Sequence, residues 1–362
     1  MMAKRLLVMA GGTGGHVFPG LAVAEHLKAA GWQVEWLGTA DRIEAQLVPK
    51  HGFDINFVTI SGVRGNGLLR LIKAPFMVLN AVFQSIRILR RFRPSLVLGM
   101  GGYASGPGGA AAWLCGIPLV LHEQNATPGL TNKILARFAT KVLTAFDIPH
   151  WQTAGAKKHQ VGNPVRAAFA SVSEKKSVET ELKILICGGS LGARVLNQQV
   201  PAALAQLSTH DFSVWHQAGK GNSDSVSCAY QAAGLSESNV RISDFIDEMV
   251  EAYEWADVVI CRAGALTVSE VALAGRCAIF VPLPHAVDDH QTKNAQYLVA
   301  NEAALLLPQP QLEQGGLVPL LEQLNAKRES IVEMSQKARA CGERKATEKV
   351  ANICVQEASA KP

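Results

Sequence analysis

Several features are scarce in this sequence, and each scarcity excludes a class of protein. The seven cysteines are odd in number and form no CxxC pair, which argues against a disulfide framework or a zinc site and for a reducing compartment. Charged residues make up only 18 %, but hydrophobic residues make up 48 %, so the composition is globular rather than disordered. The length of 362 residues predicts two domains, each able to bury a core.

No apolar run is both long and unbroken. Residues 6–10 are too few for the apolar core of a signal peptide, which takes about 7–15 residues. Residues 94–122 are long enough to cross a membrane, but seven glycines and three prolines interrupt them. We therefore predict two buried strands around a glycine-rich loop, and no membrane span.

Acidic residues are missing from much of the first half. None occurs between Asp54 and Glu123, whereas residues 64–93 contain seven basic residues. Residues 1–163 carry 17 Lys and Arg against 7 Asp and Glu, and residues 164–362 carry 18 against 23. The net charge of +5 therefore divides into +10 and −5. A basic first half predicts an anionic partner, either nucleic acid, anionic lipid or a phosphorylated substrate.

Short apolar strands alternate with helical segments in both halves. We predict strands at residues 4–10, 33–37, 96–100, 118–122, 183–187, 257–261 and 278–282, and helices at residues 21–30 and 194–207. This alternation predicts an α/β fold of two doubly wound domains, each with a parallel sheet covered on both faces.

The domain break is expected near residues 162–164. We assign residues 1–163 plus 342–362 to the first domain and residues 164–341 to the second, because the charged helical end of the chain can return to the first domain. Ligands of such sheets bind at the carboxyl ends of the strands, so two facing domains predict a cleft between two sets of glycine loops.

Three glycine-rich loops follow predicted strands: GGTGGH at residues 11–16, GGYASGPGG at residues 101–109 and GGSLGA at residues 188–193. Glycine allows close approach to a ligand, and a following helix N-terminus attracts anions, so we predict phosphate or pyrophosphate binding. A structural tight turn is the alternative. A dinucleotide site is disfavoured, because Val17 replaces the third glycine and no acid after the second strand is placed for a ribose.

Two polar segments of the second half allow two interpretations each. Residues 262–270 (RAGALTVSE) follow a predicted strand, and Thr267 with Glu270 has capping-box spacing. The functional alternative is an anion site at this helix start, with Glu270 accepting from a ribose diol. Gln291 and Asn294 share a helix face and either bind sugar hydroxyls or are solvated.

Three further groups are candidates for chemistry. His122 and Glu123 end a predicted strand and are either general-base candidates or buried structural groups. Arg166 is either a phosphate clamp or an exposed hinge arginine. Residues 285–294 contain two histidines and two aspartates, but they suit a helix start better than the usual metal-ligand spacings.

Apolar residues recur at helical spacing in residues 68–83, among the seven bases of residues 64–93. An ordinary amphipathic helix, a patch that docks on an anionic bilayer and an RNA-binding surface all fit this pattern. RNA binding needs aromatic side chains to stack bases, and Tyr103 is the only tyrosine before Tyr230. We favour the membrane surface over the core helix, and both over nucleic acid.

The sequence resembles the MurG family, the bacterial N-acetylglucosaminyltransferases of peptidoglycan synthesis. The matching motifs are GGTGGHVFP at 11–19, GGYASGPGG at 101–109, HEQN at 122–125, PGLTN at 128–132, GNPVR at 162–166, GGSLGA at 188–193, RAGALTVSE at 262–270 and residues 284–294. They occur in order over residues 4–300. The match weakens in residues 171–181 and after residue 307.

The resemblance implies a GT-B fold, with two Rossmann-like domains facing a central cleft. It implies transfer of GlcNAc from UDP-GlcNAc to the 4-hydroxyl of undecaprenyl-pyrophosphoryl-MurNAc-pentapeptide, with inversion and a β(1→4) bond. The first domain would bind the acceptor and the cytoplasmic face of the bacterial inner membrane peripherally, and the second would bind UDP-GlcNAc. The resemblance implies neither a required cofactor nor a nucleic-acid partner. It leaves open whether Mg²⁺ assists turnover and whether cell-wall synthesis proteins bind.

The resemblance also implies roles for individual residues. His16 is the first choice for the catalytic base, or it only helps to hold phosphate, and Glu123 is the second choice. The donor site would comprise Thr13, Gly14, Gly15, Asn125, Arg166, Ser190, Ile246, Ala265, Leu266, Thr267, Val268, Ser269, Glu270 and Gln291. The acceptor pyrophosphate would meet Gly14, Gly15, Tyr103, Ser105 and Gly106.

Two alternatives from other functional classes stay open. A UDP-GlcNAc 2-epimerase would share the fold and the donor but need no lipid acceptor, and the acid-free basic segment argues against it. A non-catalytic lipid- or glycan-binding module would need neither the base candidates nor the donor motif.

Overall fold

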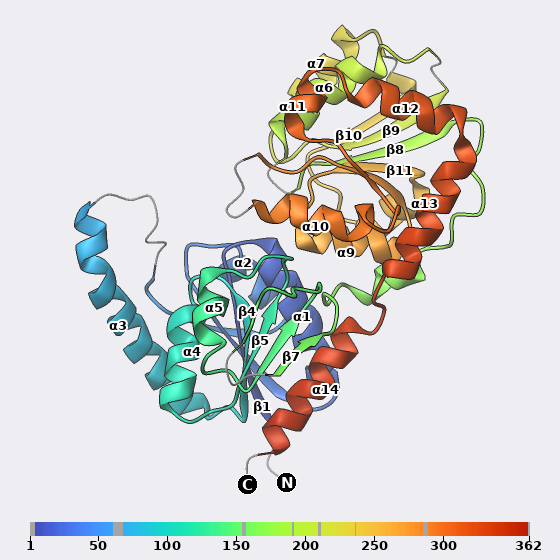
Figure 1. Ribbon diagram of the computed structural model, residues 1–362. Helices are drawn as coiled ribbons and strands as arrows, with labels where there is room; N and C mark the ends of the chain where they lie inside the picture. The colour runs from blue at the N-terminus through green and yellow to red at the C-terminus, as the bar shows by residue number, and fades with distance from the viewer. Residues whose placement is uncertain are drawn as a thin grey trace. The chain divides into compact units, whose positions relative to one another are not determined.

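The computed structural model describes residues 4–60, 68–153, 157–189, 192–208, 211–235, 237–284 and 289–360. The chain forms two compact units, Met1–Arg166 with Lys345–Pro362, and Ala167–Arg344 (Figure 1). The domain boundaries were expected after residues 163 and 341, a few residues before the observed ones after Arg166 and Arg344. The predicted cleft between the two units stays a prediction.

The first unit contains a parallel sheet of seven strands in the order β3-β2-β1-β4-β5-β6-β7. Its elements are β1 (Arg5–Ala10), α1 (Gly14–Ala29), β2 (Gln33–Gly38), α2 (Glu44–Lys50), β3 (Asp54–Phe57), α3 (Leu68–Phe92), β4 (Leu96–Gly101), α4 (Ser105–Leu114), β5 (Leu119–Glu123), α5 (Leu130–Leu135), β6 (Lys141–Thr144), β7 (Lys157–Gln160) and α14 (Ala346–Ser359). The helix predicted at residues 21–30 begins earlier, at Gly14.

Both faces of this sheet are buried, which explains why its strands are continuous apolar runs. Leu6 and Val8 of β1 face a core that includes residues of α1 and α14. Leu7 and Met9 point to the opposite face, where they pack with residues of α3, α4 and α5. The C-terminal helix α14 thus returns to the first unit, where it contacts α1.

The second unit contains a parallel sheet of six strands in the order β10-β9-β8-β11-β12-β13. Its elements are a 3₁₀ turn (Ala167–Ser171), β8 (Leu182–Cys187), α6 (Arg194–Leu204), β9 (Phe212–Gln217), α7 (Ser223–Ala232), a 3₁₀ turn (Glu237–Asn239), β10 (Val240–Ser243), α8 (Met249–Trp255), β11 (Val258–Cys261), α9 (Ala265–Ala274), β12 (Cys277–Phe280), α10 (His290–Val299), β13 (Leu305–Leu306), α11 (Gln309–Glu313), α12 (Leu317–Ala326) and α13 (Arg328–Cys341).

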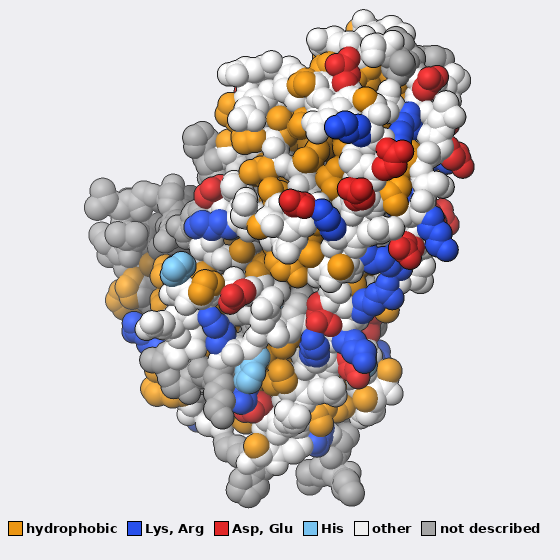
Figure 2. Space-filling model, turned by 45° about the vertical axis from the view of Figure 1, so that its right-hand side comes forward, with side chains coloured by type: hydrophobic (Ala, Val, Ile, Leu, Met, Phe, Trp, Pro, Cys, Tyr) orange, Lys and Arg blue, Asp and Glu red, His pale blue; other side chains and the backbone are white. Residues whose placement is uncertain are grey.

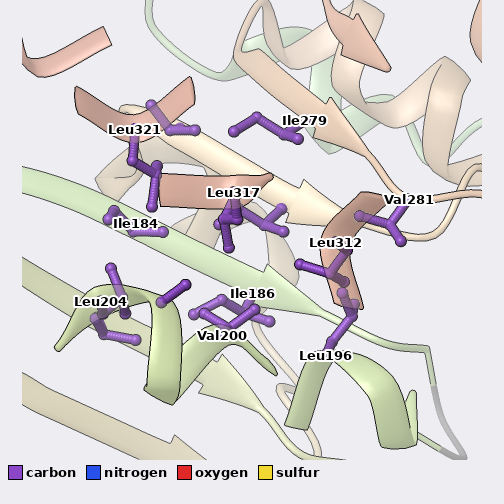
Figure 3. Packing of buried hydrophobic residues seen from close by; sticks show 14 of the residues in the cluster. Ile184, Ile186, Leu196, Val200, Leu204, Ile279, Val281, Leu312, Leu317 and Leu321 are labelled. Atoms are coloured by element: carbon purple, nitrogen blue, oxygen red, sulfur yellow. The ribbon is translucent and has the colours of Figure 1, made fainter. Parts of the chain in front are cut away.

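The main core of the second unit lies between its sheet and α6, α7, α11 and α12 (Figure 3). Ile184 and Ile186 of β8 point toward Val200 of α6 and Leu317 of α12. The helices α9 and α10 lie on the other side of the sheet (Figure 1), and α8 contacts α9. Alternate strand residues therefore enter separate apolar layers, as in a doubly wound fold.

The strand order positions the glycine loops. In both units it reverses between two central strands, β1 and β4 in the first and β8 and β11 in the second. In open α/β sheets, ligands bind in the crevice outside the carboxyl ends of the strands at this reversal. The loops that begin at Gly11, Gly101 and Gly188 all lie there, as does Gly264 before α9.

The second glycine loop is shorter than predicted. Residues 101–109 were expected to form one phosphate loop, but α4 begins at Ser105 and contains the later glycines. A Cβ atom on Gly108 would lie 2.3 Å from the sulfur of Met9, so this glycine allows α4 to pack closely on β1. Only residues 102–104 remain as a loop.

Residues 94–122 form β4, α4 and β5. The two buried strands are confirmed, but the expectation that glycine would break any helix between them is wrong, because Gly106, Gly108 and Gly109 lie inside α4. Within the described ranges, no helix combines the length and the apolar character needed to cross a membrane.

Candidate functional site

In the first unit, the loops after β1 and β4 touch each other. Gly102 has a φ of +92°, and a Cβ atom there would lie 2.3 Å from the carbonyl oxygen of Gly11. Only glycine permits both the backbone conformation and this approach. A Cβ atom on Gly101 would lie 2.8 Å from Cδ2 of His16. The imidazole of His16 therefore packs against the end of β4, between two predicted phosphate loops.

Thr13, Gly14, Gly15 and His16 form the start of α1. Thr13 is the N-cap residue, with an extended backbone and no capping bond from its side chain. Its Oγ1 lies 3.5 Å from Nδ1 of His16. Thr13 is exposed and the other three residues are half-buried. A helix start offers backbone N–H groups and a positive dipole end, so this turn suits an anionic group beside an imidazole.

Glu44 holds the first glycine loop, a role that sequence reasoning missed. Its carboxylate is fully buried. Oε2 accepts from the N–H of Gly12 at 3.0 Å, and Oε1 accepts from the N–H of Thr39 at 3.1 Å and from its hydroxyl at 2.8 Å. An acid thus does follow β2, but its oxygens bind protein groups. This contact argues further against a dinucleotide ribose at this position.

Glu123 ends β5 and is 2 % exposed. Oε1 accepts from the N–H and the side-chain amide of Asn125 at 3.0 and 3.3 Å. Oε2 accepts from the N–H of Gly129 at 3.0 Å and from Nδ2 of Asn132 at 2.8 Å. A carboxylate has about four lone-pair sites, and four protein donors occupy them. The geometry favours holding the loop over general-base catalysis.

His122 is fully buried, and its Nε2 donates to the carbonyl of Gly162 at 2.9 Å. Burial lowers the pKa of His122 to about 4, against the opposite but smaller effect of this hydrogen bond. The imidazole is therefore neutral near pH 7. Of the two interpretations of His122, the structure supports the structural one.

Two other predicted site residues of the first unit, Tyr103 and Arg166, are exposed. Tyr103 is 45 % exposed, with the guanidinium of Arg42 5.8 Å from its ring centroid. Arg166 is exposed and lies 5.9 Å from the ring of Phe18.

Ser105 and Gly106 begin α4. Ser105 is fully buried, and its hydroxyl lies 3.1 Å from the carbonyl of Met9 and 2.7 Å from that of Gly101. This side chain braces the ends of β1 and β4, so the expected contact between its hydroxyl and a pyrophosphate is not supported. Gly106 is half-buried in the first turn of the helix.

In the second unit, two glycines of the loop after β8, Gly188 and Gly192, are closely packed. The N–H of Gly192 donates to the carbonyl of Gly189 at 2.9 Å. A Cβ atom on Gly192, whose φ is +75°, would lie 2.1 Å from the carbonyl oxygen of Ala218. The predicted phosphate residue Ser190 lies outside the described residues.

The helix α9 begins at Ala265, and its N-cap is Gly264. Thr267 is therefore inside the helix, and the capping-box interpretation of Thr267 with Glu270 is wrong. Six of the predicted donor residues form the first turns of α9: Ala265, Leu266, Thr267, Val268, Ser269 and Glu270. The hydroxyl of Ser269 donates to the carbonyl of Ala265 at 2.9 Å.

Glu270 lies near the glycine loop after β8. Burial raises the pKa of the Cys187 thiol, and the charge of Glu270 raises it further. Cys187 is the last residue of β8, and Glu270 belongs to the helix that follows the neighbouring strand β11. Glu270 is half-buried, so this side chain combines proximity to the loop with access to a ligand.

Gln291 and Asn294 share one face of α10, as predicted. Oε1 of Gln291 accepts from the N–H of Leu283 at 2.9 Å. Asn294 is fully buried and donates to the carbonyl of Ala263 at 3.2 Å, so it supports the loop before α9. Ile246 is buried in the loop between β10 and α8.

No group of three or more His, Cys, Asp or Glu that could hold a metal ion occurs among the described residues. Residues 285–288, which include part of the segment weighed above as a metal site, lie outside them.

Both units match models of one glycosyltransferase family. Residues 6–144 match the glycosyltransferase family 28 N-terminal domain, and residues 183–353 match its C-terminal domain. A relative from Pseudoalteromonas atlantica is 54 % identical, covering 98 % of this chain and 96 % of its own length. It is named UDP-N-acetylglucosamine–N-acetylmuramyl-(pentapeptide) pyrophosphoryl-undecaprenol N-acetylglucosamine transferase.

The crystal structure of MurG from Acinetobacter baumannii is 41 % identical, covers 98 % of this chain and 99 % of its own, and has a TM-score of 0.83. The chain belongs to the MurG family of glycosyltransferases. The resemblance inferred from the motifs is thereby confirmed, and the two parallel sheets are those of the GT-B fold. A UDP-GlcNAc 2-epimerase from Neisseria meningitidis has a TM-score of 0.67 at 13 % identity, which shows a shared fold alone.

The contacts of Glu123 predict how its variants behave. In Glu123→Gln, an amide nitrogen replaces one carboxylate oxygen, so two donors lose their acceptor; with the nitrogen in place of Oε2, these are the N–H of Gly129 and Nδ2 of Asn132. We expect a loss of about 1–3 kcal/mol in unfolding free energy together with reduced turnover. Adding Asn132→Asp supplies an acceptor for the new amide and should restore part of both losses, as measured by thermal denaturation and steady-state kinetics.

The matched control is Asn132→Asp alone, which places two carboxylates together and should be less stable than the double variant. A double variant that recovers stability but no turnover would instead assign the catalytic base to Glu123.

Proposed function

We propose that this chain transfers GlcNAc from UDP-GlcNAc to the 4-hydroxyl of undecaprenyl-pyrophosphoryl-MurNAc-pentapeptide, with inversion at the anomeric carbon. The observation that carries the proposal is 54 % identity to a named transferase of this reaction over nearly the whole chain. The two strand reversals support it, because each places a glycine loop and a helix N-terminus at one crevice. Two phosphate-bearing substrates require two such sites.

The first unit would bind the acceptor and the second the donor. In the first unit, the start of α1 and the loop after β4 would contact the acceptor pyrophosphate. In the second unit, the glycine loop after β8 and the start of α9 would contact the diphosphate of UDP-GlcNAc. Glu270 would accept hydrogen bonds from the ribose hydroxyls. Arg166 and Asn125 are the further donor contacts that the family resemblance implies.

The reaction needs a base for the acceptor hydroxyl and stabilisation of departing UDP. His16 would take the proton while the hydroxyl oxygen bonds to the anomeric carbon and the bond to the diphosphate oxygen breaks. Its imidazole lies at a helix start between two glycine loops, whereas the carboxylate of Glu123 is occupied by four donors. The N-terminus of α9 and Arg166 would stabilise the negative charge on UDP, and the proposal requires no cofactor.

The test is UDP release from UDP-GlcNAc, with and without a short-chain analogue of the lipid acceptor. We expect release only with the acceptor, together with a new disaccharide product. In His16→Asn, we expect turnover to fall by roughly 10²–10⁴-fold, the range for loss of a general base, with UDP-GlcNAc binding retained. Repeating the assay with EDTA measures any contribution of Mg²⁺.

Full turnover in His16→Asn would remove the base assignment. Consumption of UDP-GlcNAc without acceptor would contradict the transferase and favour the epimerase alternative.

We also propose that α3 contacts the cytoplasmic face of the inner membrane. Its described part exposes large apolar side chains, with Phe76 at 74 %, Leu79 at 65 % and Phe83 at 68 %. This exposure argues against the core interpretation. Basic and acidic side chains are interspersed on the face drawn in Figure 2, whereas α3 contains bases and no acid. An apolar face flanked by bases suits an anionic bilayer.

Replacing Phe76, Leu79 and Phe83 together by serine should weaken binding to vesicles that contain phosphatidylglycerol. Each side chain contributes up to about 1.5–3 kcal/mol when buried in an apolar phase, so we expect at least a tenfold loss in vesicle sedimentation. Turnover of a detergent-soluble acceptor should persist. Phe57→Ser is the control, because Phe57 is 45 % exposed on β3. Unchanged vesicle binding in the triple variant would contradict the proposal.

A further inference from the structure

A chain of hydrogen bonds in the second unit runs from α7 to the loop beside the glycine loop. The hydroxyl of Tyr230 lies 3.0 Å from Nδ1 of His216, and Nε2 of His216 lies 3.1 Å from Oδ1 of Asn197. Nδ2 of Asn197 donates to the carbonyl of Ala218 at 2.9 Å. Tyr230 and His216 are buried and Asn197 is half-buried. The four residues come from α7, β9, α6 and the loop after β9.

The direction of every bond in this chain is determined. The amide nitrogen of Asn197 donates to a carbonyl, so its Oδ1 is an acceptor and Nε2 of His216 carries the proton. Nδ1 then accepts from the Tyr230 hydroxyl. Burial lowers the pKa of His216 to about 3, which is consistent with this neutral tautomer. Histidine suits this position because one rigid ring supplies a donor and an acceptor on opposite sides.

The inner end of the chain contacts the glycine loop. A Cβ atom on Gly192 would lie only 2.1 Å from the carbonyl oxygen of Ala218, the same oxygen that accepts from Asn197. The N–H of Gly192 donates to Gly189. A displacement of Ala218 would therefore change the packing against the loop that begins at Gly188.

We propose that His216 is a positioning residue for the donor diphosphate. With Tyr230 and Asn197, it fixes Ala218 against Gly192 and so sets the position of this last glycine of the loop after β8. The three side chains act through the backbone of Ala218 and need no contact with the ligand. This inference rests on the proposed function, in which that loop contacts the diphosphate of UDP-GlcNAc.

The inference predicts a selective loss of donor affinity. His216→Leu removes both hydrogen bonds, and we expect the Kd of UDP and the KM of UDP-GlcNAc to rise by roughly tenfold or more. Tyr230→Phe removes one bond and should raise both by about threefold. The KM of the acceptor and kcat should change by less than about twofold. His216→Gln, which retains a donor and an acceptor, should bind UDP more tightly than His216→Leu.

Tyr297→Phe is the matched control. The Tyr297 hydroxyl also donates one hydrogen bond in this unit, to the carbonyl of Cys341 at 2.7 Å, but at the end of α13. We expect wild-type affinity for UDP in this variant. Titration calorimetry with UDP measures binding without turnover, so the inference is testable even if the proposed reaction fails. Tyr230→Phe keeps it testable if His216→Leu does not fold.

Three results would overturn the inference. The first is unchanged UDP affinity in folded Tyr230→Phe and His216→Leu, even with reduced melting temperatures, because the network would then serve stability alone. The second is a loss confined to kcat. The third is an equal loss of UDP affinity in Tyr297→Phe. Absence of acceptor-dependent turnover in the wild type would contradict the proposed function but not the predicted change in UDP binding.

Discussion

The sites depend on one constraint: a glycine loop can approach a ligand only if other groups hold it in place. Glycine loses more conformational freedom on folding than any other residue, and buried backbone groups need hydrogen-bond partners. Buried or half-buried polar side chains meet this need in both units. Glu44 binds the N–H of Gly12, Glu123 binds the loop after β5, and Asn197 binds the carbonyl of Ala218. In the proposed function, the first turns of α1 and α9 would then offer backbone N–H groups to the substrates.

Features encoded locally were predictable from the sequence. The strand predicted at residues 96–100 is β4 (Leu96–Gly101), and the one at 183–187 lies within β8 (Leu182–Cys187). Apolar runs bounded by glycine suffice for such strands, because both faces of a parallel sheet are buried. The motifs likewise identified the family, since they occur in order over most of the chain. The glycine loops were predictable as well, because each directly follows one of these apolar strands.

Features that depend on the direction of a side chain were not predictable. Glu44 lies 32 residues from Gly12 along the chain, and nothing in its neighbourhood indicates that its carboxylate points back to that loop. Composition could not separate Glu123 as a base from Glu123 as a support, because the answer lies in four donors contributed by Asn125, Gly129 and Asn132. The hydroxyl of Ser105 fits a phosphate loop by sequence, yet its partners are carbonyls of two neighbouring strands. Direction of a side chain, rather than its type, decided each case.

Amide hydrogen exchange at Gly12, measured by NMR in the wild type and in Glu44→Gln, tests the central claim most directly. The account predicts a protected Gly12 amide in the wild type and exchange at least about tenfold faster in the variant, with Val8 in β1 unchanged. Glu25→Gln, at an exposed acid of α1, should leave Gly12 protected. Wild-type exchange at the rate of an exposed amide, or equal protection in Glu44→Gln, would contradict the claim that buried side chains hold the glycine loops.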